Sequence, residues 1–172
     1  MSFADFAASI VSPDLRRVAA HWNQARGTRT LPGWRDIRPS AIAPQLPLVW
    51  AYAYDAQADD FVGRLAGDVI ARLFGQTFKG IRMTQLQPRI DVSFLFSRSR
   101  QVIGRPALFR SNGDVFHMTD CHGYGERIIM PLAEDGIEAD GIFGATQYQT
   151  SYQPQGDGIS EHWFNIEAMA AA

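Results

Sequence analysis

The chain has 172 residues, of which 46% are hydrophobic and 20% charged. This length and composition suit one globular domain with a hydrophobic core and leave little room for a second. The formal net charge of −2 offers no excess of basic residues, so we do not expect nucleic acid as a partner. The single cysteine, Cys121, excludes an intrachain disulfide and any zinc site built from several cysteines.

The sequence gives no sign of a membrane segment or a secretory signal. No apolar run reaches the length that spans a bilayer, and residues 1–17 place acidic residues before basic ones, the reverse of a signal peptide. We therefore expect a cytoplasmic protein without a membrane partner.

Residues 1–24 are predicted to form an N-terminal helical arm. Ser12 and Pro13 are typical of a helix start, and Gly27 is typical of its end. Apolar side chains recur at helical spacing before and after this start, beginning with Phe3, Phe6 and Ile10. Such a stripe must be buried, either against the chain's own sheet or against a second copy. We expect a homodimer through these helices and keep the intramolecular cap as the alternative.

Residues 48–66 read as a β-hairpin, because two apolar, aromatic-rich runs flank a polar stretch. Alternation in the first run places Trp50 and Tyr54 on a face of large side chains, and Val49 and Ala51 on a face of small ones. We expect the small face to leave space above it.

Two helices are predicted next, over residues 68–74 and 91–104, ended by Gly75 and Gly104. An irregular stretch with four prolines precedes the hairpin, over residues 29–47.

The remainder of the chain is predicted to be antiparallel sheet. Two dipeptides that favour hairpin turns, Asn112-Gly113 and Asp135-Gly136, divide it. Whether residues 106–120 form one interrupted strand or two stays open. In the tail, a short helix is predicted from Ser160, anchored by Trp163 and Phe164.

This order of elements indicates an α+β domain with one antiparallel sheet and helices on one face. It resembles a PAS domain, and specific stretches carry the likeness: "LPGWRDIRPSAIAPQLPLVWAYAYD", "RLAG", "FGQTFKGIRMTQL", and "MPLAEDG" followed by "GIFGATQYQ". They are similar to a PAS-like family of alphaproteobacterial single-domain proteins of undefined function, from about Trp22 to about Tyr148.

The resemblance implies a five-stranded antiparallel sheet, a helical flank over a pocket, and a role in sensing or in docking a partner. The chain then divides into the helical arm (1–24), a PAS-like domain (25–150) and a C-terminal tail (151–172).

A cluster of metal-capable residues occurs in the segment "HMTDCH": His117, Asp120, Cys121 and His122. The two histidines and the cysteine decide whether it can converge. On one strand His117 and Cys121 share a face while His122 points away, so the three do not converge without a turn. We predict no metal site and no cofactor. The alternative is a haem-binding protein or a small α+β enzyme that uses His117 or His122.

No pair of residues suits acid–base catalysis, because the candidate carboxylates fall in predicted turns, where solvated caps are the ordinary explanation. We therefore predict that the protein is not an enzyme.

One arginine interrupts the predicted strand "FVGRLAG". If Arg64 faces inward, its charge needs compensation by a carboxylate such as Asp36 or Asp68, or by an acidic or carbonyl-bearing ligand. If it faces outward, it is a surface charge. We predict a ligand site with Arg64 as the polar anchor, and with Trp50, Tyr54 and Tyr148 as its neighbours.

These observations favour a sensory or protein-interaction module without catalytic activity. It would hold a small ligand over the sheet and act through a separate signalling partner, since the sequence contains no recognisable kinase, cyclase or DNA-binding segment.

Overall fold

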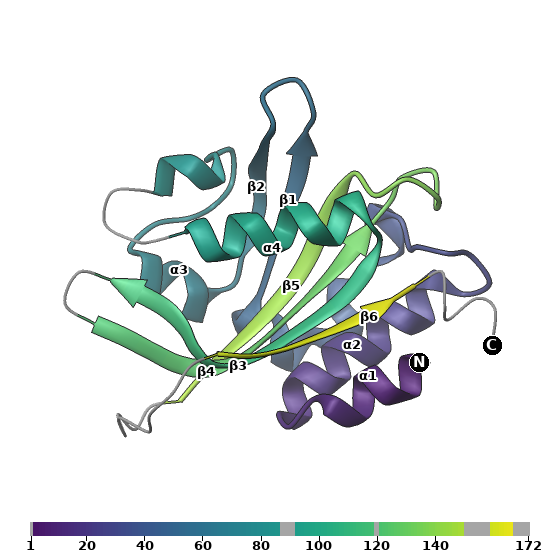
Figure 1. Cartoon of the computed structure of the whole chain (residues 1–172), viewed down its shortest axis with the longest axis horizontal. Coiled ribbons are helices and arrows are strands. Elements are labelled where there is room, and N and C mark those ends of the chain that lie inside the picture. The colour runs from purple at the N-terminus through teal and green to yellow at the C-terminus, as the bar shows by residue number, and fades with distance from the viewer. Residues whose placement is uncertain (1, 87–91, 119–120, 150–158, 167–172) are drawn as a thin grey trace.

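The computed structural model describes residues 2–86, 92–118, 121–149 and 159–166. One antiparallel sheet of six strands, in the order β2-β1-β5-β4-β3-β6, forms its centre (Figure 1). The strands are β1 (Val49–Asp55), β2 (Asp60–Ala66), β3 (Ala107–Met118), β4 (Cys121–Leu132), β5 (Gly141–Tyr148) and β6 (Ser160–Asn165). The predicted α+β class is confirmed, with one strand more than the five expected.

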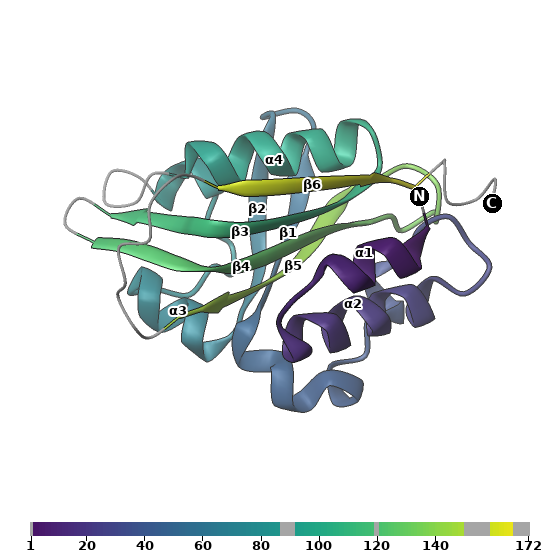
Figure 2. The same ribbon diagram turned by 60° about the horizontal axis from the view of Figure 1, so that its bottom comes forward.

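Helices cover both faces of the sheet, as Figure 2 shows. On one face lie α1 (Phe3–Ser9) and α2 (Pro13–Arg26); on the other lie α3 (Asp68–Phe74) and α4 (Ser93–Gly104). Three 3-10 segments complete the fold: η1 (Trp34–Asp36), η2 (Pro39–Leu48) and η3 (Met83–Leu86). No helix of the described residues is long and apolar enough to cross a membrane.

The helical arm begins and ends where the sequence predicted. The hydroxyl of Ser12 accepts a hydrogen bond from the amide of Leu15, Pro13 occupies the first turn, and Gly27 ends α2 with a positive φ of 59°. The irregular backbone between α1 and α2 reverses the chain, so both helices lie along the same face of the sheet.

The apolar stripe of the arm is buried within the chain itself. Phe6, Ile10 and Trp22 are at most 1% exposed and belong to a hydrophobic cluster with Val49 and Ala51 of β1. The small side chains of β1 thus do not leave open space. They allow the arm to approach the sheet closely, and the arm fills the room that we expected above them.

The opposite face carries the large side chains of β1. Trp50 and Tyr52 pack there with Phe61, Phe78 and Phe109, and α3, η3 and α4 contribute side chains to the same cluster. At Gly144 of β5 a Cβ atom would lie 2.3 Å from the ring of Trp50, so this glycine is what lets the indole lie flat on β5.

Two local predictions are wrong. Asn112-Gly113 does not form a turn, since β3 is one continuous strand in which these residues pair with Glu126 and Gly125 of β4. Pairing along the whole of β4 overrides the local turn preference. At the other dipeptide the turn is confirmed, with Gly136 at a φ of 78°.

The predicted helix from Ser160 is a strand, β6, which pairs with β3. Trp163 packs on Phe109 on the α4 face, with ring centroids 4.6 Å apart, while Phe164 packs on Phe6 of α1 on the other face, at 5.3 Å. Two adjacent aromatic residues can reach opposite layers only from a strand. Part of the predicted tail therefore belongs to the sheet.

A buried ion pair attaches the arm to the sheet. Arg110 Nε of β3 donates to Glu126 Oε1 of β4 at 2.7 Å, and both side chains are 7% exposed. The same carboxylate accepts hydrogen bonds from the backbone amides of Val11 and Ser12, at 2.9 and 2.7 Å. Glu126 thus satisfies the amides at the junction of α1 and α2.

Replacing Glu126 by Gln should destabilise the protein strongly. The change leaves the buried Arg110 guanidinium without its counter-ion, which costs about 3–5 kcal/mol. We expect that decrease in the free energy of unfolding, measured by urea denaturation. The matched control is Glu134→Gln, because Glu134 is 59% exposed and lies 4.0 Å from Arg35; it should change stability by less than about 0.5 kcal/mol. Equal effects in both variants would contradict the assigned role of Glu126.

Candidate functional site

A row of four polar residues crosses the sheet on the α4 face. The strand register places Glu161 (β6) beside Ser111 (β3), Ser111 beside Arg127 (β4), and Arg127 beside Thr146 (β5). We call these four residues the polar row. Ser111, Arg127 and Thr146 are at most 4% exposed, so the row lies inside a layer that is otherwise apolar.

Arg127 is the central residue of the row. Its Nε donates to the hydroxyl of Thr146 at 3.2 Å, its Nη2 donates to the carbonyl of Val115, and its side chain is hydrogen-bonded to Tyr148. Burial lowers the pKa of its guanidinium, but an arginine keeps its charge in a protein. Among the described residues no carboxylate forms an ion pair with Arg127.

Three hydroxyl groups on this face lack a hydrogen-bond partner among the described residues: those of Tyr52, Ser99 and Ser111. All three side chains are completely buried. Burial is also the main cause that raises the pKa of Tyr52, so its phenol stays protonated and can donate. Each unpaired buried hydroxyl costs about 1–3 kcal/mol, and such groups in a native protein point to a bound water, ion or ligand.

Trp50 and Tyr148 extend the row at its β5 end. The indole Nε1 of Trp50 donates to the hydroxyl of Thr146 at 3.0 Å, a position that Gly144 makes available. Burial raises the pKa of Tyr148, and this shift is opposed by Arg127 and Thr146 through charge and hydrogen bonds. Two of the residues predicted for the site therefore lie beside a buried arginine.

That arginine is not Arg64. A bulge in the pairing of β1 with β2 falls between Ala51 and Tyr52, opposite Arg64, and the guanidinium lies over the ring of Trp34 at 5.5 Å. Trp34 packs against the cluster of the helical arm, and Arg64 is exposed. The structure thus does not bring Arg64 together with Trp50, Tyr54 and Tyr148.

Sequence reasoning did not single out Arg127, which stands beside a second charged residue in the predicted strand segment "ERIIM". The signal was present: on a strand buried on both faces, adjacent charges must point into opposite layers. Which layer receives which charge depends on the register with β3 and β5, which the sequence alone does not give.

Two charged contacts tie α4 to both sides of the sheet. Arg98 donates to Glu161 of β6 at 2.7 and 2.9 Å. Arg100 forms an ion pair with Asp59 at the tip of the β1–β2 hairpin and donates to the phenol of Tyr54 at 2.5 Å. Tyr54 is therefore a contact of α4 rather than a neighbour of Arg127. Because these pairs are partly exposed, salt weakens them.

We predict that the Arg98→Gln variant loosens α4 over the polar row. Losing the pair with Glu161 should speed amide hydrogen exchange in α4 about two- to fivefold, the change that corresponds to about 0.5–1 kcal/mol. The matched control is Arg72→Gln in α3, since Arg72 Nε donates only to the carbonyl of Asp68 in its own helix. Unchanged exchange in α4, or the same change in both variants, would contradict this role of Arg98.

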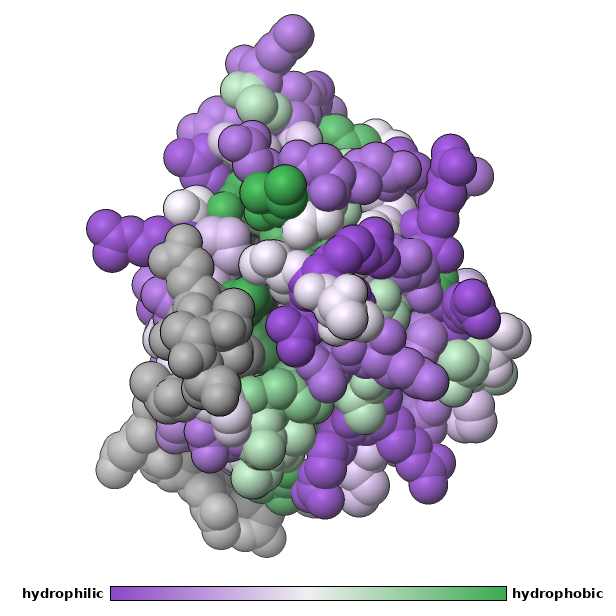
Figure 3. All heavy atoms as spheres, turned by 90° about the vertical axis from the view of Figure 1, so that its right-hand side faces the viewer, coloured by the Kyte–Doolittle hydropathy of each residue, from purple (hydrophilic) through white to green (hydrophobic). Residues whose placement is uncertain are grey.

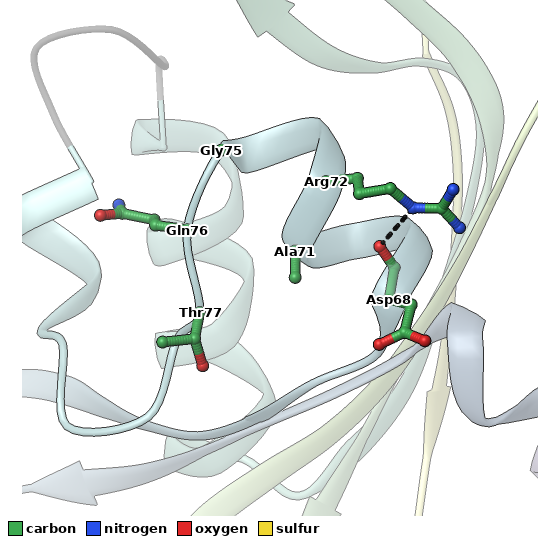
Figure 4. Close-up of a pocket in the computed structure, with 6 residues that line it drawn as sticks. All are labelled: Asp68, Ala71, Arg72, Gly75, Gln76 and Thr77. Atoms are coloured by element: carbon green, nitrogen blue, oxygen red, sulfur yellow. Dashed lines mark hydrogen bonds between the residues drawn. The ribbon is translucent and has the colours of Figure 1, made fainter.

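An open pocket of about 840 Å³ lies beside α3 and is lined by Asp68, Ala71, Arg72, Gly75, Gln76 and Thr77. In Figure 4 the side chains of Arg72 and Gln76 extend in opposite directions, away from the space between α3 and the segment that follows it. This pocket has room but no convergent polar groups, and it is the weaker candidate for a specific ligand.

A third feature is a pocket of about 340 Å³ between α2 and residues 29–47, which we call the connector. His21, Asp36 and Arg38 border this pocket. The Nε2 atom of His21 accepts a hydrogen bond from the amide of Arg38 at 3.0 Å. Burial lowers the pKa of His21, and the charge of Arg38 lowers it further. His21 is therefore neutral in the folded protein and fastens the connector to α2.

This arrangement predicts a pH-dependent stability. Because the pKa of His21 is lower in the folded than in the unfolded chain, its contribution is present above the ordinary histidine pKa and is lost as the pH falls below it. The wild-type melting temperature should fall from pH 7.5 to pH 5.5, and His21→Gln should reduce that fall. The control His162→Gln, at an exposed position of β6, should not. An unchanged fall in His21→Gln would show that other groups cause it.

The cluster of metal-capable residues lies at the β3–β4 hairpin, where His117 pairs with His122 and Met118 with Cys121. The side chains of His117, Cys121 and His122 lie outside the described part of the structure. Among the residues that the structure does describe, no group of three potential metal ligands occurs. The haem or enzyme alternative stays a prediction.

A family model described as a PAS domain matches residues 10–147, which is most of the chain. A search of curated proteins finds no match.

Proposed function

The chain belongs to the PAS domain family, whose members are in general sensory or interaction modules and not enzymes, and we propose that this one senses a small ligand held on the polar row. One observation carries the proposal: Arg127 is buried among apolar side chains, and no carboxylate of the described residues compensates its charge. A ligand that supplies the missing negative or carbonyl oxygen would stabilise this side chain.

The surroundings of Arg127 support the same assignment. The unpaired hydroxyls of Tyr52, Ser99 and Ser111 lie on the same face and offer further hydrogen bonds. Arg98 of α4 forms an ion pair with Glu161 of the polar row. The helix that covers the site is therefore held by a partly exposed contact that can break and re-form. Ligand binding would then change how firmly α4 lies on the sheet, and a separate protein would respond to that change.

A homodimer through the N-terminal helices remains a prediction. The apolar stripe is already buried within the chain, so a dimer would have to use the outward faces of α1 and α2. On the side seen in Figure 3, hydrophobic residues form only small areas among hydrophilic ones. The large hydrophobic residues exposed among the described ones lie in three separate segments: Val11 at the α1–α2 junction, Leu65 in β2 and Ile137 between β4 and β5. Light scattering of the full chain tests the dimer; a cytoplasmic location is likewise an expectation.

The proposed function predicts that stabilising ligands depend on Arg127. In a thermal-shift screen of small metabolites, hits should raise the melting temperature of the wild type, by the equivalent of about 2.7 kcal/mol at one hundred times the Kd. Arg127→Met should abolish this shift. The free variant should stay folded, because replacing an uncompensated buried charge by an apolar side chain of similar volume is neutral or stabilising.

The matched control is Arg64→Met, which removes an exposed arginine from the other face of the sheet. It should keep the full ligand shift. Hits that stabilise Arg127→Met as much as the wild type would refute the proposed site. A visible absorption spectrum of the purified protein tests the haem alternative separately.

A further inference from the structure

The charge balance around Arg127 limits the ligand to one negative charge. Tyr52 and Tyr148, the groups that interact electrostatically with Arg127, are neutral phenols whose pKa values are raised by burial. The carboxylate of Glu161 in the same row is paired with Arg98. Among the described residues Arg127 is therefore a buried cation without a paired carboxylate. A dianion would bring a second charge into the apolar layer without a partner, which is unfavourable.

The donor geometry favours a carboxylate as the anionic group. A guanidinium presents a planar fork that matches the two oxygens of a carboxylate. A carboxylate has about four acceptor sites, so it has sites left for hydroxyl donors on this face, which are those of Tyr52, Ser99 and, beside Arg127 in the register, Ser111. A phosphate monoester carries a charge between −1.5 and −2 at neutral pH and would exceed the single compensating charge.

The rest of the environment is apolar. The layer that contains Arg127 consists largely of aromatic and aliphatic side chains, which include Trp50, Phe78, Met83, Leu95, Phe109 and Ile129. A ligand body rich in hydroxyls or amides would leave those groups without partners there. An aromatic or aliphatic body would instead gain from leaving water.

We propose that the ligand of the polar row is a small monocarboxylate with an apolar body, held by Arg127 through its carboxylate and by the aromatic layer through its body. This inference rests on the proposed function and adds the chemical class of the ligand. It separates the site from the open pocket beside α3, where Arg72 is exposed and its side chain points away from the space.

Four probes test this class at pH 7.5. Three carry a phenyl ring: phenylacetate, its neutral amide phenylacetamide, and phenyl phosphate. The fourth is the polar dicarboxylate succinate. The readout is the indole N–H resonance of Trp50 in two-dimensional NMR spectra, because this group donates to Thr146 in the row. Phenylacetate should shift the resonance saturably. The other three probes should bind at least tenfold more weakly.

Variants of single residues test which side chains bind the carboxylate of the ligand. Arg127→Met should weaken phenylacetate binding at least tenfold, while Arg72→Met, the matched control in α3, should leave it unchanged. Ser99→Ala removes an unpaired hydroxyl without touching a contact of Arg127. It should weaken binding two- to tenfold and leave the free protein at least as stable as the wild type. This second variant keeps the test decisive if Arg127→Met fails to fold.

Other outcomes would overturn the inference. Equal or tighter binding of phenylacetamide, phenyl phosphate or succinate in an Arg127-dependent manner would refute the ligand class and leave the proposed sensory site standing. Phenylacetate binding that is lost in Arg72→Met, or no shift of the Trp50 resonance by phenylacetate at millimolar concentration, would refute the class as well. The metabolite screen with Arg127→Met judges the proposed function itself.

Discussion

Two adjacent charged residues in the middle of a doubly covered sheet determine much of this structure. Glu126 and Arg127 follow one another on β4, and strand geometry sends their side chains to opposite faces. Helices cover both faces, so both charges are buried, at 6% and 4% exposure. Each must therefore be compensated within its own layer, and the two layers do this differently.

On the face of the helical arm, compensation is complete. Arg110 and the amides of Val11 and Ser12 surround Glu126, and the pairing ties the junction of α1 and α2 to the sheet. On the α4 face the acceptors that Arg127 finds among the described residues are neutral, and the same face carries unpaired hydroxyls. This contrast is the basis on which we propose that Glu126 has a structural role and that Arg127 binds an anionic ligand.

Local signals in the sequence were sufficient for the helices and the first hairpin. Pro13 and Gly27 delimit α2 through backbone requirements that no distant contact alters. Predictions failed where distant pairing decides. Asn112-Gly113 favours a turn but finds partners on β4, and Trp163-Phe164 suits a helix or a strand until both layers are known. Arg64 and Arg127 look alike in sequence, and only the bulge in β2 and the register of β4 place one outside and the other inside.

The buried polar residues of the α4 face and those of the arm face lie on the same strands, β3, β4 and β5. Ser111, Arg127 and Thr146 face α4. An adjacent residue in each strand, Asn112, Glu126 or Gln147, faces the arm and borders the pocket at the α1–α2 junction. A hydrogen-bonded sheet is stiff along its pairing direction, and packed layers transmit displacements. A shift of β4 that shortens contacts to Arg127 on one face therefore changes the distances from Glu126 to the amides of Val11 and Ser12 on the other. The site and the arm cannot relax independently, because neighbouring residues of one strand belong to each.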